Sequence, residues 1–121
     1  MSYVRLVIAS VLVVAGTGAN GQELSSHELR RQLLSDEQLV ANPKQPTIAL
    51  LSDAQAAMGY VRGVSDALAI GLPSCQPLNA SPGQKMAIVR KFLQEHPENW
   101  SEPAVTIVLT ALKSAFGCNT K

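Results

Sequence analysis

Apolar residues recur at steps of three and four through most of the chain, which is the spacing of one face of an α-helix. The strongest series belongs to a helix that we expect to begin with Asp53 as its N-cap and to end at residues 69–70. Gly71 and Pro73 then act as stop signals. The apolar stripe of this helix consists of Ala57, Val61, Val64 and Leu68.

Capping residues mark the starts of three further helices. Ser25 and Ser81 each lie three residues before a Glu or Gln, which is the spacing of a capping box. Ser101 is expected to cap the last helix. The apolar stripes are Leu29 and Leu33 in the first helix, Met86, Val89 and Leu93 in the third, and Val105, Val108, Leu109, Leu112 and Phe116 in the fourth.

No segment has an equally strong strand pattern. Residues 47–51 could form a strand, but it would be isolated and would lead directly into the cap at Asp53. Prolines in residues 42–46 separate this segment from the first helix. The predicted fold class is therefore all-α, a small single-domain bundle of four to five helices.

The first residues have the pattern of a secretory signal. Arg5 gives a weakly positive start, and a nearly unbroken apolar run follows from Leu6 to Ala15. Because a membrane span needs roughly 20 apolar residues, we expect cleavage after Ala19 or Gly21 rather than an uncleaved anchor. The chain would then divide into a signal peptide at 1–21 and a helical domain at 22–121, with no membrane association after cleavage.

Charge and cysteine content narrow the possible partners and suggest a covalent link. Loss of Arg5 from the ten basic residues leaves nine against nine acidic ones, so the near-neutral domain gives no support for a nucleic-acid partner.

Cys75 and Cys118 are the only cysteines, and an even number in an exported protein predicts a disulfide. Two free thiols or a metal site are the alternatives. The disulfide could contribute about 4 kcal/mol by constraining the unfolded chain.

A row of small residues lies inside the second helix. Gly59, Gly63 and Ala67 are spaced by four, and each glycine in a helix interior costs roughly 1 kcal/mol relative to alanine. Tight packing in the core is the interpretation that we prefer over a functional cleft. Asp66, on the same helix, is expected to pair with Arg62 or to cap a neighbouring helix.

The chain lacks a recognisable set of catalytic residues. His27 and His96 lie at helix ends without a partner motif, so neither is expected to be a general base. Neither histidine has metal-ligand spacing with a cysteine, and no glycine-rich phosphate loop precedes a helix. We therefore expect no enzyme activity, no metal and no cofactor. A small hydrolase that uses Asp66 and His96 is a remote alternative.

Several short segments occur in an order that resembles a known family. They are residues 59–68 (GYVRGVSDAL), 75–77 (CQP), 81–84 (SPGQ), 96–98 (HPE) and a closing segment that ends at Cys118. The chain resembles the Rap/Tai immunity proteins, which protect bacteria against peptidoglycan amidases delivered by type VI secretion. The resemblance covers residues 55–118. Many members carry an additional cysteine pair between the first helix and the residues before the Gly-Tyr run, where this chain has Leu33, Leu34 and residues 56–58 instead.

The resemblance implies a periplasmic helical protein, usually a homodimer, that plugs the active-site groove of an amidase with a cysteine nucleophile. A protruding loop or helix end, within residues 71–80 or 96–102, would make the contact. The candidate partner-binding residues are Gln76, Asn79, Glu98, Asn99 and Trp100, and the candidate structural residues are Gly59, Tyr60, Gly63 and Asp66. The small-residue row or the fourth helix could form the homodimer contact.

A different function is compatible with the same scaffold. A periplasmic structural or stress-related binding module, without a toxin partner, would show the same helices and the same disulfide. The neighbouring gene distinguishes the two, because an immunity protein is expected to be encoded beside its toxin.

Overall fold

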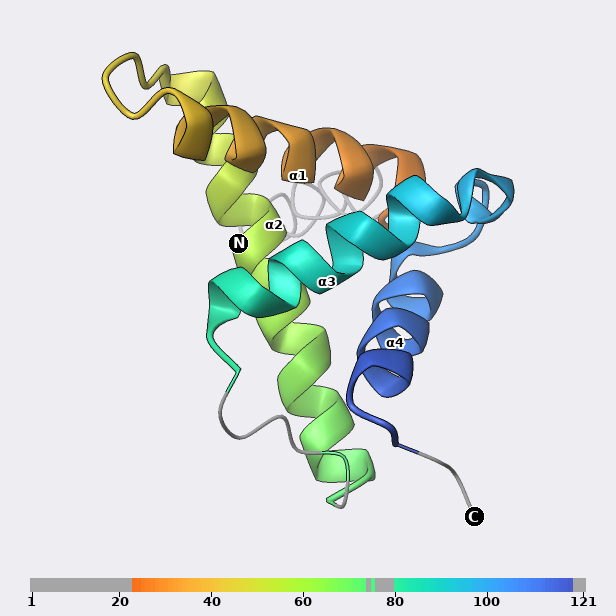
Figure 1. The fold of residues 1–121 in the computed structure, drawn as a ribbon. Coiled ribbons are helices and arrows are strands. Elements are labelled where there is room, and N and C mark those ends of the chain that lie inside the picture. The colour runs from red at the N-terminus through yellow and green to blue at the C-terminus, as the bar shows by residue number, and fades with distance from the viewer. Residues whose placement is uncertain (1–22, 74, 76–79, 119–121) are drawn as a thin grey trace, which may run out of the picture.

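The computed structural model describes residues 23–73, 75 and 80–118 and is all-α, as predicted. The predicted signal segment and the candidates Gln76 and Asn79 lie outside the described residues. Within them, the only β-type pairing is an isolated bridge between Ser25 and Pro103. The elements are α1 (Ser26–Ala41), α2 (Ile48–Gly71), α3 (Pro82–Glu95), the short 3₁₀ helix η1 (Pro97–Asn99) and α4 (Ala104–Ala115) (Figure 1).

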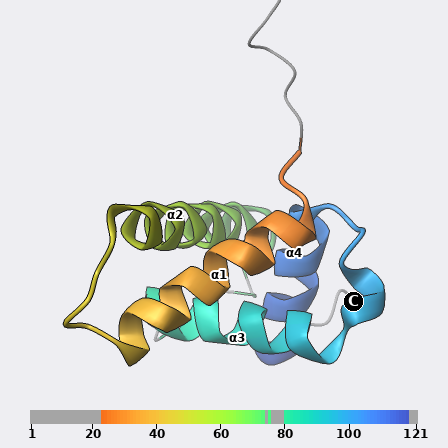
Figure 2. The ribbon, with the colours of Figure 1, turned by 90° about the horizontal axis from the view of Figure 1, so that it is seen from above.

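The long helix α2 is the element around which the others are arranged. Helices α1 and α3 both cross α2, while α4 lies beside its C-terminal half (Figure 1). Seen from above, α1 runs diagonally between α2 and α3 (Figure 2). One continuous core joins all four helices, and its buried members are Leu29, Leu33, Ala57, Val61, Leu68, Cys75, Met86, Val89, Leu93, Ala104, Ile107, Val108, Ala111 and Leu112.

The start of α1 is fixed by contacts with the opposite end of the chain. Ser25 caps the helix as predicted, because its Oγ accepts a hydrogen bond from the amide of Glu28 at 3.2 Å. The Ser26 hydroxyl, fully buried, donates to the carbonyl of Glu102 at 2.7 Å. The amide of Ala104 donates in turn to the carbonyl of Leu24 at 2.8 Å. The first turns of α1 and α4 therefore hold each other in place.

The second helix begins earlier than predicted. Thr47 is its N-cap, with Oγ1 accepting from the Leu50 amide at 3.2 Å, so residues 47–51 are the start of α2 and not a strand. The predicted cap at Asp53 is wrong. Asp53 instead accepts hydrogen bonds from Arg31 of α1 at 2.7 Å and from the Ser35 hydroxyl at 3.0 Å. Both hydrogen bonds lower the pKa of the Asp53 carboxyl from its ordinary value, and the bond from Arg31 has the larger effect.

The third helix begins as predicted, whereas the fourth does not. Ser81 and Gln84 form a complete capping box, with bonds of 3.1 Å and 2.7 Å between side chains and backbone amides. The predicted cap at Ser101 is wrong, because α4 starts two residues later, after Pro103, and has no side-chain cap. The backbone pairing with Leu24 satisfies the first amide of α4 in its place.

The buried face of α4 is also rotated from the predicted stripe. Val108 and Leu112 are buried as expected, but Val105 is 37% exposed and Leu109 is only partly buried. Ala104, Ile107 and Ala111 occupy the core positions instead. Because α4 is apolar on more than one side, its sequence does not indicate which of its apolar sides is covered.

The predicted disulfide between Cys75 and Cys118 is confirmed, with Cα atoms 5.1 Å apart. Cys75 follows the C-terminal end of α2, and Cys118 follows that of α4, so the bond joins the ends of two neighbouring helices. Gly117 provides the turn before Cys118 with a φ of 63°, a backbone conformation that residues other than glycine rarely adopt.

Candidate partner-binding surfaces

No three His, Cys, Asp or Glu side chains among the described residues are close enough to hold a metal ion. His27 packs against Trp100, and His96 lies beside Glu98, so both histidines are close to the η1 turn. Two surfaces of the described residues could bind another protein.

The first candidate surface is the turn at residues 96–102, which is anchored by Trp100. The indole Nε1 donates to the carbonyl of Leu93 in α3 at 2.7 Å. The guanidinium of Arg30 from α1 lies over the ring, 4.1 Å from its centroid, in a cation–π contact. The ring of His27 packs edge-on against the indole at 5.8 Å. Trp100 thus joins α1, α3 and the turn, and its role in partner binding stays a prediction.

The outer part of this turn presents a carboxylate. Glu98 is exposed and lies 3.1 Å from Nδ1 of His96, whose ring is in contact with Phe92, with centroids 4.2 Å apart. A hydrogen bond from its own backbone amide and then one from His96 hold the pKa of Glu98 below its ordinary value. Glu98 therefore stays ionised over the physiological pH range.

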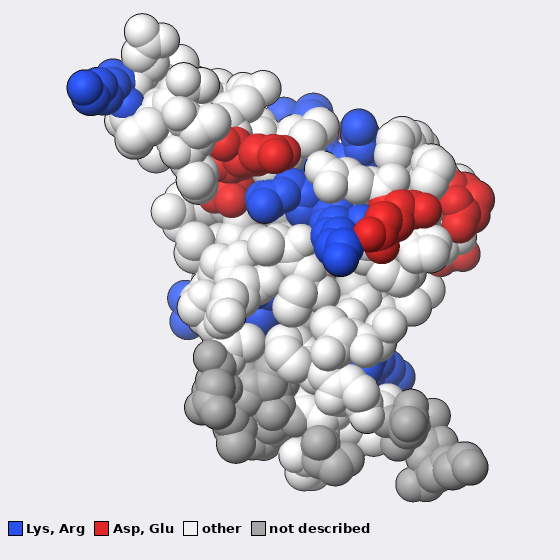
Figure 3. All heavy atoms as spheres, viewed as in Figure 1, with Lys and Arg blue, Asp and Glu red and all other residues white. Residues whose placement is uncertain are grey.

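Negative charge gathers around the same turn. Figure 3 shows acidic side chains at the end of the molecule where α3 runs into η1. Glu95 ends α3 and has an ion pair with Lys91 at 3.8 Å, whereas Glu98 contacts no Lys or Arg among the described residues and lies beside His96. The turn thus combines a fixed backbone with an available negative charge.

The structure describes three of the predicted partner-binding residues. Glu98, Asn99 and Trp100 are together in the turn that includes η1. Gln76 and Asn79, which were predicted from the segment around Cys75, remain predictions because they lie outside the described residues.

The small-residue row of α2 faces outward. Gly59, Gly63 and Ala67 are exposed, and a Cβ placed on either glycine would meet no atom within 4 Å. The prediction that this row packs tightly in the core is therefore wrong. Tyr60, by contrast, packs against the core, and this burial raises the pKa of its hydroxyl.

Two charged side chains lie on the same outward side of α2. Arg62 and Asp66 are both exposed, and neither forms an ion pair or a side-chain hydrogen bond with another described residue. The predicted pairing of Asp66 with Arg62 is thus wrong, as is its predicted capping role. The pair lacks the favourable order for a helix, in which the acid precedes the base by four residues.

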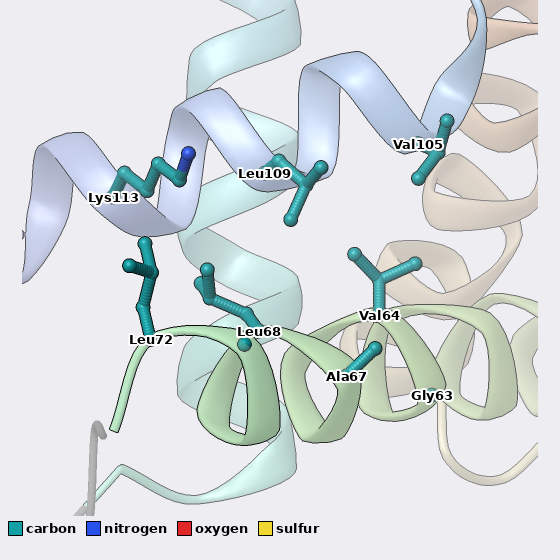
Figure 4. Close-up of a pocket in the computed structure, with 9 residues that line it drawn as sticks. Gly63, Val64, Ala67, Leu68, Leu72, Val105, Leu109 and Lys113 are labelled. Carbon is teal, nitrogen blue, oxygen red and sulfur yellow. The ribbon is translucent and has the colours of Figure 1, made fainter. Parts of the chain in front are cut away.

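The second candidate surface is an apolar groove between α2 and α4, which sequence analysis missed. It has a volume of about 460 Å³. In Figure 4, side chains of the two helices face each other across it, and Lys113 lies at one end. Its walls include Gly63, Val64, Ala67 and Leu68 of α2 and Val105 and Leu109 of α4. The excess of apolar positions on α4 and the two glycines on α2 were the available signals in the sequence.

Comparison with known proteins identifies the family. A model of the Rap1a immunity proteins matches residues 22–118, which is most of the chain and includes α1 as well as the segments that carry the resemblance. The chain belongs to the Rap1a immunity proteins. No curated protein and no solved structure matches the chain.

Membership of this family indicates immunity against a secreted effector, so the expected partner is a protein. Proteins of such families are generally not enzymes and are typically exported. Among the helices of the described residues, none has the length and apolarity needed to cross a membrane. The Rap1a chain therefore presents two surfaces of different chemistry, an anionic turn and an apolar groove.

Proposed function

We propose that this protein is a periplasmic immunity protein that binds a type VI secreted peptidoglycan amidase and blocks its active site. Membership of the Rap1a family is the observation that carries the proposal. The expected signal peptide at residues 1–21 would bring the protein to the compartment where peptidoglycan is exposed to the effector. A homodimer is part of the proposal.

The turn at residues 96–102 is the surface that we assign to the effector. Trp100, held by Leu93 and Arg30, fixes the turn before binding, so little conformational entropy is lost on association. Its exposed Glu98 carboxylate suits a groove in which a cysteine nucleophile is activated by a histidine, because that histidine carries positive charge in the active pair.

Inhibition of the amidase encoded beside this gene tests the assignment. We expect nanomolar inhibition by the wild-type protein and a loss of at least about tenfold for Glu98→Lys, since reversal of a charge that faces a cation is unfavourable. Glu37→Lys on α1 is the matched control, because Glu37 is also exposed but lies on another part of the surface. Equal inhibition by both variants would remove the turn from the interface.

The same assay distinguishes the alternative function. A structural or stress-related module would leave the neighbouring amidase fully active and would give no protection to cells that receive the effector. Lack of binding to any amidase encoded beside the gene would therefore overturn the proposed function, whatever the oligomeric state.

A further inference from the structure

The groove between α2 and α4 has the size and the lining of a small-molecule site. Its volume of about 460 Å³ lies within the range of ligand pockets, which are mostly apolar and have few polar groups. Val64 and Leu68 of α2 face Val105 and Leu109 of α4 across it (Figure 4). No residue of the turn at 96–102 lines the groove, so a ligand bound there would leave the proposed effector-binding surface free.

Small residues keep the groove open on the side of α2. Gly63 and Ala67 form part of this wall, and a Cβ built on Gly63 would meet no atom within 4 Å. From Gly63 to Gly71 the wall extends for about 12 Å at the rise of an α-helix. The disulfide joins the C-terminal ends of the two helices, so it restrains the distance between the walls before any ligand binds. A narrow apolar groove of this length suits an alkyl chain.

A single positive charge lies at one end of this groove. Among the described residues that line it, only Lys113 is charged. Lys113 forms no ion pair with another described residue, and its side chain leans along α4 toward Leu109 (Figure 4). An ammonium group beside an apolar wall is complementary to a ligand that has an anionic head and an apolar chain.

Backbone hydrogen bonds limit the negative charge of the helix ends near Lys113. The C-terminal end of an α-helix carries a partial negative charge on its free carbonyls, which would oppose the binding of an anion. At the end of α2, the carbonyl of Leu68 accepts from the amide of Leu72 at 2.8 Å. At the end of α4, the carbonyl of Lys113 accepts from the amide of Cys118 at 3.0 Å. The ammonium group leans away from these ends, so its charge is the main one that a ligand in the groove would meet.

We propose that the groove binds a single-chain amphiphile with a carboxylate head, which is the chemistry of a fatty acid. The carboxylate accepts a charge-assisted hydrogen bond from Nζ of Lys113. The alkyl chain lies between Val64 and Leu68 on one side and Val105 and Leu109 on the other, so that its own surface and that of the walls are removed from water. This binding site goes beyond the proposed function, because effector recognition at the turn does not use it.

Titration of the oxidised, isotope-labelled protein with octanoate at neutral pH, followed by NMR, tests the site. We expect the amide signals of Gly63 and Gly71 to shift and to saturate, with a Kd on the order of 1 mM or tighter. Gly83, at the start of α3, lies outside the groove, so its signal should stay in place. Octanol has the same chain without the charge and should bind at least about threefold more weakly.

Two pairs of variants test the wall and the charge separately. Ala67→Leu places a larger side chain in the groove and should abolish the shifts, whereas Ala56→Leu changes an exposed position of α2 outside the groove and should not. Lys113→Gln should weaken octanoate to the level of octanol, and Lys85→Gln on α3 is its matched control. Circular dichroism of each variant checks that it is folded.

The titration contains no effector, so its result does not depend on the proposed function. The inference would be overturned by a wild-type protein whose groove signals do not saturate, or by equal binding of octanoate and octanol. Unchanged octanoate binding by Ala67→Leu or by Lys113→Gln would overturn it as well.

Discussion

The turn at 96–102 and the outward side of α2 are both on the surface, but they differ in how their side chains are satisfied. In the turn, Trp100 and His96 contact residues of α1, α3 and η1. On α2, Arg62 and Asp66 have no ionic partner among the described residues, and Ile70 is largely exposed. The side chains of the turn are thus held by contacts within the chain, whereas those on the outward side of α2 are left without such contacts among the described residues.

Removal of the disulfide should have the largest effect and should separate the two surfaces. We expect the double variant Cys75→Ser, Cys118→Ser to lose about 2–4 kcal/mol of unfolding free energy, because the unfolded chain is no longer constrained. Urea unfolding measures this loss. Trp100 is the only tryptophan, so its fluorescence reports on the turn alone and should keep its native spectrum in the folded variant. A shifted spectrum before unfolding would show that the turn depends on the disulfide.

Trp100→Ala should have the next largest effect, since it removes the contacts that hold the turn. We expect a loss of about 2 kcal/mol, below the range for fully buried tryptophans because Trp100 is only partly buried. Trp100→Phe keeps much of the ring and removes the donor to Leu93, which should cost about 1 kcal/mol. Thermal unfolding followed by circular dichroism gives both values. Equal losses for the two variants would assign the whole effect to the hydrogen bond.

Replacement of glycine by alanine should change the stability of the fold in opposite directions at two positions. Gly59→Ala should stabilise the fold by up to about 1 kcal/mol, because the added methyl group meets no atom and alanine favours the helix. Gly117→Ala should destabilise it by about 1 kcal/mol, because φ is 63° there. Urea unfolding of each variant beside the wild type measures both changes. Destabilisation by Gly59→Ala would reveal a contact that requires glycine at this position.

The smallest effect should come from the pairing of Asp53 with Arg31. The pKa of Asp53 is lower in the folded than in the unfolded protein, where it is about 3.9. The pairing therefore stabilises the fold above that pH, and this contribution is lost as the pH falls through the folded pKa. Asp53→Asn should flatten the acid limb of the stability curve. Urea unfolding of Asp53→Asn and the wild type over a series of pH values measures the limb, and identical limbs for the two proteins would contradict the prediction.

Features that depend on neighbouring residues were predictable from the sequence. The capping box of Ser81 and Gln84 needs only four consecutive residues, and the disulfide followed from two cysteines in a chain that was expected to be exported. The start of α4 was not predictable, because Leu24, from the other end of the chain, satisfies its first amide. Asp53 likewise looked like a cap, yet its partner Arg31 is on another helix.

The candidate surfaces show the same limit. The region of the turn was predicted, but the role of Trp100 depends on Arg30, which is distant in sequence. The glycine row was recognised, and its outward orientation was not. Helix α2 has apolar or small residues on two sides, so its sequence alone cannot decide which side α1 and α3 cover.

The hydrogen bonds of Ser26 and Leu24 with residues 102–104 have a consequence for biogenesis. Because these partners follow Ser26 and Leu24 by 76 residues or more, the start of α1 gains these hydrogen bonds only after residues 102–104 have been synthesised. A shorter N-terminal portion of the chain would retain the contacts of α1 with α2 but lack those at its first turn.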